Sequence, residues 1–330
     1  VAIADPGRPG QAALDLMERE ARLARKALDE ARPTGPSWAA DLLPQVLQQA
    51  RERREQRVAT GSSITGIPTG IRALDDALNG LGPGLHLLGG APGQGKTSLA
   101  LQVALHAAAE GVAVLFLTLE NGAANPATKA LAARARTSPL AIDRGAADLA
   151  AVEAAAAALR PTLARLAISE GPAGIPVADL GEMLEQAMEH HRVDRGLLVL
   201  DYLQAAARAR PQDVRQAVGA LVGELREVAI RRRVPVLALA SQNRTGGSYG
   251  AGASGGAGLD SLAESAALEY SADSLSVLTR DEKRQASTQA PGRAVLLHLV
   301  KNRNGPAGHA IPLLFRPDHG LFQEVREERR

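Results

Sequence analysis

The chain has 330 residues, 45% of them hydrophobic, and its 38 basic and 36 acidic side chains nearly cancel to a formal net charge of +2. This length allows one large domain or two smaller ones, and the charge alone favours no class of partner. Because the chain has no cysteine, disulfides, cysteine-ligated zinc sites and cysteine nucleophiles are excluded. No apolar run approaches the roughly 18 residues of a membrane span and no secretory signal opens the chain, so we expect a cytoplasmic protein with no membrane partner.

The first part of the chain predicts two helical segments. Residues 1–37 are expected to form a short N-terminal helical segment, partly disordered, because residues 1–10 are rich in Pro and Gly and residues 11–32 have helical spacing. Within residues 38–60 the sequence predicts a second helix from about Asp41 to Val58, with Pro44 in its first turn, where proline is tolerated. The apolar stripe of this helix packs either against its own domain or against a neighbouring subunit; it consists of Leu42, Leu43, Val46, Leu47 and Ala50.

Residues 61–330 predict a single α/β domain. Ala-rich, helix-like segments separate several continuous apolar runs, which are typical of strands buried on both faces. The pattern indicates a mostly parallel central sheet flanked by helices, with ligands bound at the carboxyl ends of the strands. The apolar runs occupy 85–88, 112–117, 164–168, 197–200, 235–240, 274–278, 294–300 and 311–315.

Residues 90–97 read Gly-Ala-Pro-Gly-Gln-Gly-Lys-Thr, which matches the P-loop pattern G-x-x-x-x-G-K-T. An apolar strand precedes the motif and a helix-like segment, 98–109, follows it. A Gly-rich turn between a strand and a helix is the alternative, but the Lys-Thr pair and both flanks favour a nucleoside triphosphate site. Lys96 is expected to contact the β- and γ-phosphates and the Thr97 hydroxyl to bind Mg²⁺. The predicted nucleotide-binding residues are Ala91, Pro92, Gly93, Gln94, Gly95, Lys96, Thr97 and Ser98.

Acidic residues end two of the predicted strands. Asp201 follows the run 197–200, where it is expected to hold Mg²⁺ beside Thr97; the alternative is a helix N-cap. Glu120 ends the strand that begins at Val112, where it is expected to orient the attacking water; the alternative is a solvated loop acid.

Polar and basic residues follow two of these strands towards a predicted DNA-facing channel. Gln242 comes directly after the third of them, 236–240, where an amide can sense the γ-phosphate; the alternative is an ordinary turn. Arg208 and Arg210, in the loop after Asp201, are expected to contact DNA phosphates without reading sequence. The loop 245–258, which follows Gln242, is rich in glycine and carries no charge.

Lys301 and Arg303 follow the strand 294–300. They are either surface cations or, in the sharper interpretation, an arginine finger inserted into the ATP site of a neighbouring subunit.

Together these segments resemble the C-terminal motor domain of bacterial replicative helicases of the DnaB type, which has the RecA-like fold. The resemblance covers about residues 39–325 and depends on the order of many short motifs. Besides the P-loop these are Ile64–Gly70 with Leu74-Asp75, Leu117–Glu120, Asp201–Gln204, Pro235-Val236, Ser241–Arg244, Glu264-Ser265, Ala272-Asp273 and Lys301–Pro306.

The resemblance implies ATP and Mg²⁺ as cofactors and a role for each matching residue. It implies that Gln242 couples hydrolysis to the DNA loops, that Arg244 contacts DNA, and that Arg303 with Lys301 acts on the nucleotide of the next protomer. It also implies that the helix 38–60 docks on an adjacent subunit and closes a hexameric ring. The implied partners are single-stranded DNA, further copies of the chain, and a primase or helicase loader.

Two departures from the family pattern shape the expectation. Only a short segment precedes the linker helix, where the family has a helical collar domain, so we expect a collarless ring. The Gly-rich loop and Asp260–Ser265 replace the family's more basic sequence, which weakens the expected DNA contact. We expect an ATP-driven ring that translocates on single-stranded DNA. The alternatives are an oligomeric ATPase used for assembly or regulation without translocation, and a RecA-like, filament-forming recombinase ATPase.

Overall fold

A computed structural model describes residues 38–61, 64–120, 122–172, 174–208, 210, 213–241, 266–285 and 292–325. The predicted segment 1–37 and the predicted site residues Gln242 and Arg244 lie outside these ranges. The chain divides into two units, residues 1–62 and 63–330. Within the described part, no helix is both long and apolar enough to cross a membrane.

The first unit contains helix α2 (Ala39–Thr60), which the sequence predicted. The helix begins slightly earlier than expected, so Pro44 lies in its second turn rather than its first. Gly61 ends the helix in the left-handed conformation, with φ 73°, and its N–H donates to the carbonyl of Arg57. No residue of α2 is buried, and the predicted apolar stripe is exposed along its length.

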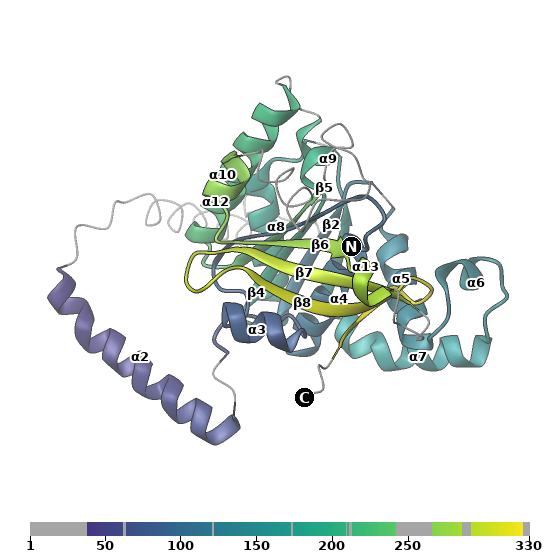
Figure 1. Ribbon diagram of the computed structural model, residues 1–330, viewed down its shortest axis with the longest axis horizontal. Helices are drawn as coiled ribbons and strands as arrows, with labels where there is room; N and C mark the ends of the chain where they lie inside the picture. The colour runs from purple at the N-terminus through teal and green to yellow at the C-terminus, as the bar shows by residue number, and fades with distance from the viewer. Residues whose placement is uncertain are drawn as a thin grey trace, which may run out of the picture. The chain divides into compact units, whose positions relative to one another are not determined.

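The second unit is built on a nine-stranded sheet with the order β3-β2-β4-β5-β1-β6-β7-β8-β9 (Figure 1). The strands from β3 to β6 are parallel, and β7, β8 and β9 add an antiparallel extension. Each predicted apolar run forms a strand, whereas the short β9 was not predicted. The bounds are β1 (Gly84–Gly90), β2 (Ala113–Thr118), β3 (Leu166–Glu170), β4 (Gly196–Asp201), β5 (Pro235–Ser241), β6 (Ser274–Arg280), β7 (Arg293–Asn302), β8 (His309–Arg316) and β9 (Leu321–Glu324).

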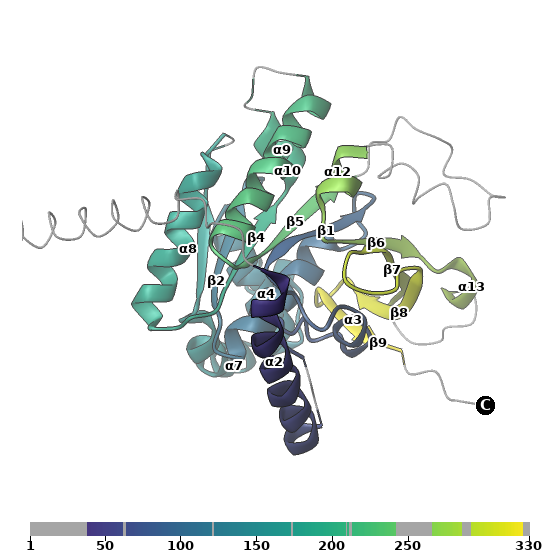
Figure 2. The same cartoon turned by 90° about the vertical axis from the view of Figure 1, so that its left-hand side faces the viewer.

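Helices cover both faces of the sheet, which explains the continuous apolar runs. Along β4, Leu197 and Val199 enter one core while Leu198 and Leu200 enter the other. The first core lies under α3 (Arg72–Leu78), α4 (Lys96–Ala109), α5 (Ala124–Ala135) and α7 (Leu149–Leu163). The second lies under α8 (Val177–His191), α9 (Leu203–Ala207), α10 (Val214–Arg231) and α12 (Ala266–Ser271), which Figure 2 shows together on one side. Two further short helices are α6 (Pro139–Asp143) and α13 (Glu282–Gln285).

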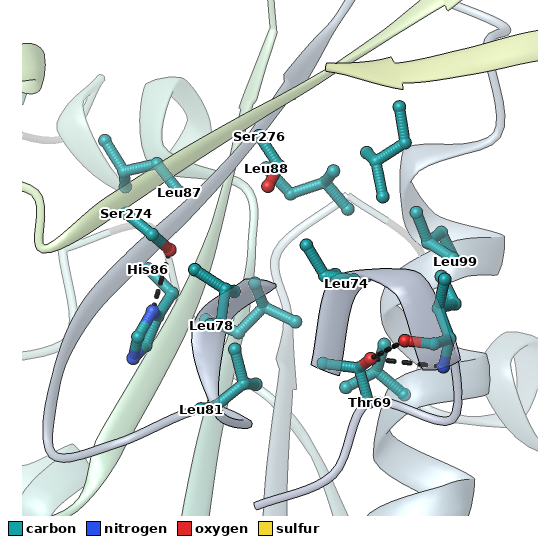
Figure 3. A pocket seen from close by; sticks show the side chains of 14 residues that line it. Thr69, Leu74, Leu78, Leu81, His86, Leu87, Leu88, Leu99, Ser274 and Ser276 are labelled. Atoms are coloured by element: carbon teal, nitrogen blue, oxygen red, sulfur yellow. Dashed lines mark hydrogen bonds between the residues drawn. The ribbon is translucent and has the colours of Figure 1, made fainter. Parts of the chain in front are cut away.

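Buried polar groups tie β1 to β6 near the amino ends of both strands. His86 contacts Ser274 Oγ through Nδ1 at 2.8 Å (Figure 3). Its Nε2 contacts the Gly82 carbonyl, also at 2.8 Å. Because a carbonyl can only accept, Nε2 carries the proton and Nδ1 accepts from the Ser274 hydroxyl. Burial lowers the pKa of His86, so the ring is neutral at neutral pH. These contacts border a small cavity of about 30 Å³ whose other lining residues are mostly leucines.

Candidate active site

The loop between β1 and α4 places two glycines in the left-handed region. Gly93 has φ 76° and Gly95 has φ 93°, conformations that side chains with a Cβ rarely adopt. A Cβ on Gly95 would also lie 2.8 Å from Phe322 Cζ and 2.9 Å from Phe315 Cζ. Those two rings stack with centroids 4.3 Å apart. This packing holds the loop against β8 and β9, and loops with this sequence pattern typically bind phosphate through backbone N–H groups.

Arg293, the first residue of β7, supports the same loop. Its Nη1 donates to the Gly93 carbonyl at 2.8 Å, and its guanidinium carbon lies 6.0 Å from the centroid of the Phe315 ring. This residue is not among those predicted from the sequence. No local signal identifies it, because Arg293 and Gly93 are 200 positions apart.

Lys96 is positioned over the loop by the start of α4. Its Nζ donates to the carbonyls of Gly90 and Ala91, at 2.8 and 3.1 Å. Burial lowers the pKa of Lys96, while the negative charges of Asp201 and Glu120 raise it. A partly desolvated ammonium group at this position suits a phosphate, which balances the charge better than neutral carbonyls do.

Thr97 and Asp201 meet across the sheet. The Thr97 hydroxyl donates to Asp201 Oδ2 at 2.8 Å, and Asp201 ends β4 next to the loop. Burial raises the pKa of Asp201, an effect opposed by the Thr97 hydrogen bond and the charge of Lys129. A hydroxyl and a carboxylate are oxygen ligands that suit Mg²⁺. In the described ranges no group of three or more His, Cys, Asp or Glu residues could hold a metal ion.

Glu120 lies just after the carboxyl end of β2, at the same end of the parallel strands as Asp201. The N–H of Leu119 donates to the Asp201 carbonyl at 3.0 Å, which keeps the end of β2 beside β4. Glu120 itself is exposed, and its charge raises the pKa of both Lys96 and Asp201. Glu170, which the sequence analysis did not single out, accepts from the N–H of Ala123 at 3.2 Å and so holds the segment that follows Glu120.

Gln204 connects the region after β4 to the end of β5. Its Nε2 donates to the Ser241 carbonyl at 2.8 Å, and its Oε1 accepts from the Ser241 N–H at 3.0 Å. Ser241 is the residue before Gln242, the predicted sensor. Gln204 is not a predicted site residue and entered only within the family motif Asp201–Gln204; its place three residues after Asp201 is the signal that could have identified it.

The predicted DNA contacts differ in their surroundings. Arg208 is exposed at the end of α9. Arg210 forms a two-pronged ion pair with Glu224, at 2.8 and 2.7 Å, which raises the pKa of Arg210 and lowers that of Glu224. The exposed Arg208 therefore remains the better placed of the two for a phosphate.

Lys301 and Arg303 lie near the amino ends of the parallel strands, whereas the P-loop lies at their carboxyl ends. Asn302 of β7 pairs with Ser274 at the start of β6, whereas the P-loop follows the end of β1. One strand length, about 20 Å, therefore separates Arg303 from the P-loop of its own chain. Arg303 contacts Asp273 and the Tyr270 carbonyl, and Lys301 Nζ contacts the same carbonyl at 3.4 Å.

Comparisons with known proteins show which family this chain is similar to. Residues 66–324 match the family model described as DnaB-like helicase C terminal domain. The chain is 30% identical, over 88% of its length, to the replicative DNA helicase DnaB of Leifsonia xyli subsp. xyli, and 27% identical, over 93% of its length, to the replicative DNA helicase DnaC of Bacillus subtilis. It spans only 64% and 66% of these two relatives.

Solved structures establish the fold. One solved ATPase domain superposes with a TM-score of 0.73 at 22% identity, covering 88% of this chain and all of that domain. The structure of a DnaB-like replicative helicase and its interactions with primase superposes with a TM-score of 0.72 at 21% identity, covering 97% of this chain and 73% of that one. The predicted RecA-like fold, with a mostly parallel sheet flanked by helices, is therefore confirmed.

Proposed function

Because the chain belongs to the family of DnaB-like helicase C-terminal domains, we propose that it is an ATP-driven, ring-forming motor that translocates on single-stranded DNA and separates duplex DNA during replication. The contact between Thr97 and Asp201 beside Lys96 carries the proposal, because it places hydroxyl, carboxylate and ammonium groups around one P-loop. The relatives named replicative helicases support the DNA-directed part.

ATP and Mg²⁺ fit the residues at this site. The P-loop backbone from Ala91 to Ser98 and the Lys96 ammonium would bind the phosphates, and Thr97 and Asp201 would hold Mg²⁺. The metal, when bound, neutralises charge that develops on the phosphate oxygens. Glu120, exposed beside this site, would orient the attacking water and accept its proton.

Arg303, with Lys301, would complete the site of a neighbouring protomer. Arg303 lies at the opposite end of the strands from its own P-loop, so it can reach a bound nucleotide only on another copy of the chain. This supports a head-to-tail homo-oligomer, for which a hexameric ring is the proposed form. A primase or helicase loader is a further proposed partner, because a similar structure includes a helicase's interactions with primase.

Steady-state ATP hydrolysis, measured with and without single-stranded DNA at moderate salt, tests the proposal. We expect a several-fold rise in rate on adding DNA, and we expect Lys96→Ala to abolish hydrolysis because the variant loses the phosphate-binding cation.

A normal basal rate that DNA does not change would contradict the motor. It would support the second candidate function, an oligomeric ATPase for assembly or regulation. The engagement of Arg210 by Glu224, which occupies one predicted DNA-binding cation, favours this candidate.

A further inference from the structure

Asp273 contacts the proposed trans-acting arginine and fixes it to the central strand of the sheet. We propose that Asp273 is a positioning residue that sets the place and orientation of Arg303 for hydrolysis in the neighbouring protomer. This inference rests on the proposed function, since it requires Arg303 to act in trans.

Asp273 is itself held firmly against β1. Its Oδ2 accepts from the Leu85 N–H at 2.9 Å, and its own N–H donates to the Leu85 carbonyl at 2.7 Å. A Cβ on Gly84, whose φ is 146°, would lie 2.5 Å from that Oδ2, so only glycine allows this approach. The carboxylate therefore has one place in the fold, directly beside the amino end of β1.

The same residue holds Arg303 through both backbone and side chain. The Arg303 N–H donates to the Asp273 carbonyl at 2.8 Å, and Arg303 Nε lies 2.9 Å from Asp273 Oδ1. Arg303 Nη2 also donates to the Tyr270 carbonyl at 3.3 Å. The side chain is thus fixed along its Nε side, while 41% of it remains exposed to solvent.

This arrangement suits an arginine that must reach across an interface. A guanidinium has five N–H donors, and the two contacts through Nε and Nη2 leave the Nη1 end to meet a phosphate oxygen. A long arginine side chain loses rotational freedom when it binds, and prior anchoring reduces that loss. Asp273 therefore holds Arg303 in a conformation in which it can stabilise the negative charge that develops in the transition state.

The anchor also lies close in sequence to the predicted DNA-facing loop. Tyr270 belongs to α12, which starts at Ala266, and Asp273 comes two residues after α12 ends. On the other side, Arg226 of α10 lies 3.6 Å from Asp273 Oδ1. Tyr270 and Asp273, which hold Arg303, therefore come 12 and 15 positions along the chain after the end of the loop 245–258, which is expected to meet DNA.

The test substitutes Asp273→Asn in the full chain. Asparagine keeps an oxygen for the Leu85 N–H but removes the charge that faces Arg303. We expect kcat for ATP to fall about 10- to 100-fold, the effect of misplacing a catalytic group by a small distance. The KM for ATP should change less than about twofold, because the variant's own P-loop is intact. Asp76→Asn, the same change in an exposed ion pair with Arg72, is the matched control and should hydrolyse ATP at the wild-type rate.

Mixed oligomers separate positioning from a structural role. Lys96→Ala protomers have an intact Arg303 but a disabled P-loop, so mixing them with Asp273→Asn protomers should restore hydrolysis above that of either variant alone. Mixtures of Lys96→Ala with Arg303→Ala test the trans role itself in the same way. Should the asparagine variant be insoluble, Asp273→Ser, which is smaller and neutral, replaces it in the same mixtures.

The outcomes are distinguishable. Recovery in both mixtures supports the proposal. Recovery with Arg303→Ala but not with the Asp273 variant, or a wild-type kcat for Asp273→Asn, overturns the role of Asp273 and leaves the proposed function standing. Wild-type hydrolysis by Arg303→Ala alone overturns the trans assignment and, with it, this inference.

Discussion

Asp201 combines a proposed catalytic role with an energetic cost to the fold. The carboxylate is buried, and burial raises its pKa above the usual 3.8, despite the opposing hydrogen bond from Thr97. A buried acid with a raised pKa disfavours the folded state when it is ionised. The site therefore keeps a charge that the metal-free protein would be more stable without.

Asp201→Asn should consequently raise stability while abolishing hydrolysis. At neutral pH the variant lacks the buried charge, so we expect its free energy of unfolding to exceed that of wild type by an amount of the order of 1 kcal/mol. The penalty in wild type is complete above the folded-state pKa and absent below the unfolded-state pKa, so the difference should shrink as the pH falls.

Thermal and denaturant unfolding of both proteins, without nucleotide or Mg²⁺, at neutral and acidic pH, checks this prediction. A variant that is less stable than wild type at neutral pH would show that the hydrogen bond from Thr97 outweighs burial.

At the scale of elements, the contact between α9 and the end of β5 joins two functional segments. Gln204 uses both ends of its amide on the backbone of Ser241, so it fixes the end of β5, one residue before Gln242 in the sequence. The segment that carries Arg208 follows Gln204 directly.

We expect Gln204→Glu to reduce the stimulation of hydrolysis by DNA about tenfold, a partial loss of a coupling that is typically 5- to 150-fold. Glutamate keeps the size of glutamine but cannot donate to the Ser241 carbonyl, so the junction loosens. Basal hydrolysis without DNA should change much less. The measurement is the ratio of rates with and without single-stranded DNA, and Gln102→Glu, an equivalent change at a glutamine that bonds the Phe322 backbone, is the control. An unchanged ratio would rule out coupling through Gln204.

The elements also show which parts of the structure the sequence predicts. Strands such as β4 are apolar throughout because they are buried on both faces, and a local pattern reveals them. The four-residue β9 has two exposed positions and no such pattern. In the site, the P-loop and Asp201 follow recognisable strands. Arg293 and Asp273 act through partners that only the strand order brings near them.

At the scale of the whole molecule, the exposed stripe of α2 points to association between chains. Leu43 and Leu47, one helical turn apart, are 58% and 57% exposed. Burying a leucine contributes about 1.5–3 kcal/mol, so a helix with several exposed leucines gains from packing on a neighbouring subunit. This stripe is the proposed basis for the docking of α2 in a ring.

The double variant Leu43→Gln, Leu47→Gln should raise the concentration needed for assembly by at least about tenfold. Glutamine keeps the helix propensity, so the change removes apolar surface without unfolding α2. Sedimentation over a range of protein concentrations measures the shift, with Gln45→Ala on the opposite face as the control. Electron microscopy of the wild type distinguishes rings from filaments, and an unchanged assembly midpoint would exclude the stripe as an interface.

The antiparallel extension formed by β7, β8 and β9 has one further consequence. By returning β7 across the sheet, it puts Arg303 one strand length away from the P-loop of the same chain. If each working site draws on two protomers, an open row of n protomers contains n − 1 complete sites, and only a closed assembly uses all n. The rate of ATP turnover per protomer would then show whether the assembly is closed. It would rise when the first and last protomers meet, even when the amount of assembled protein stays the same.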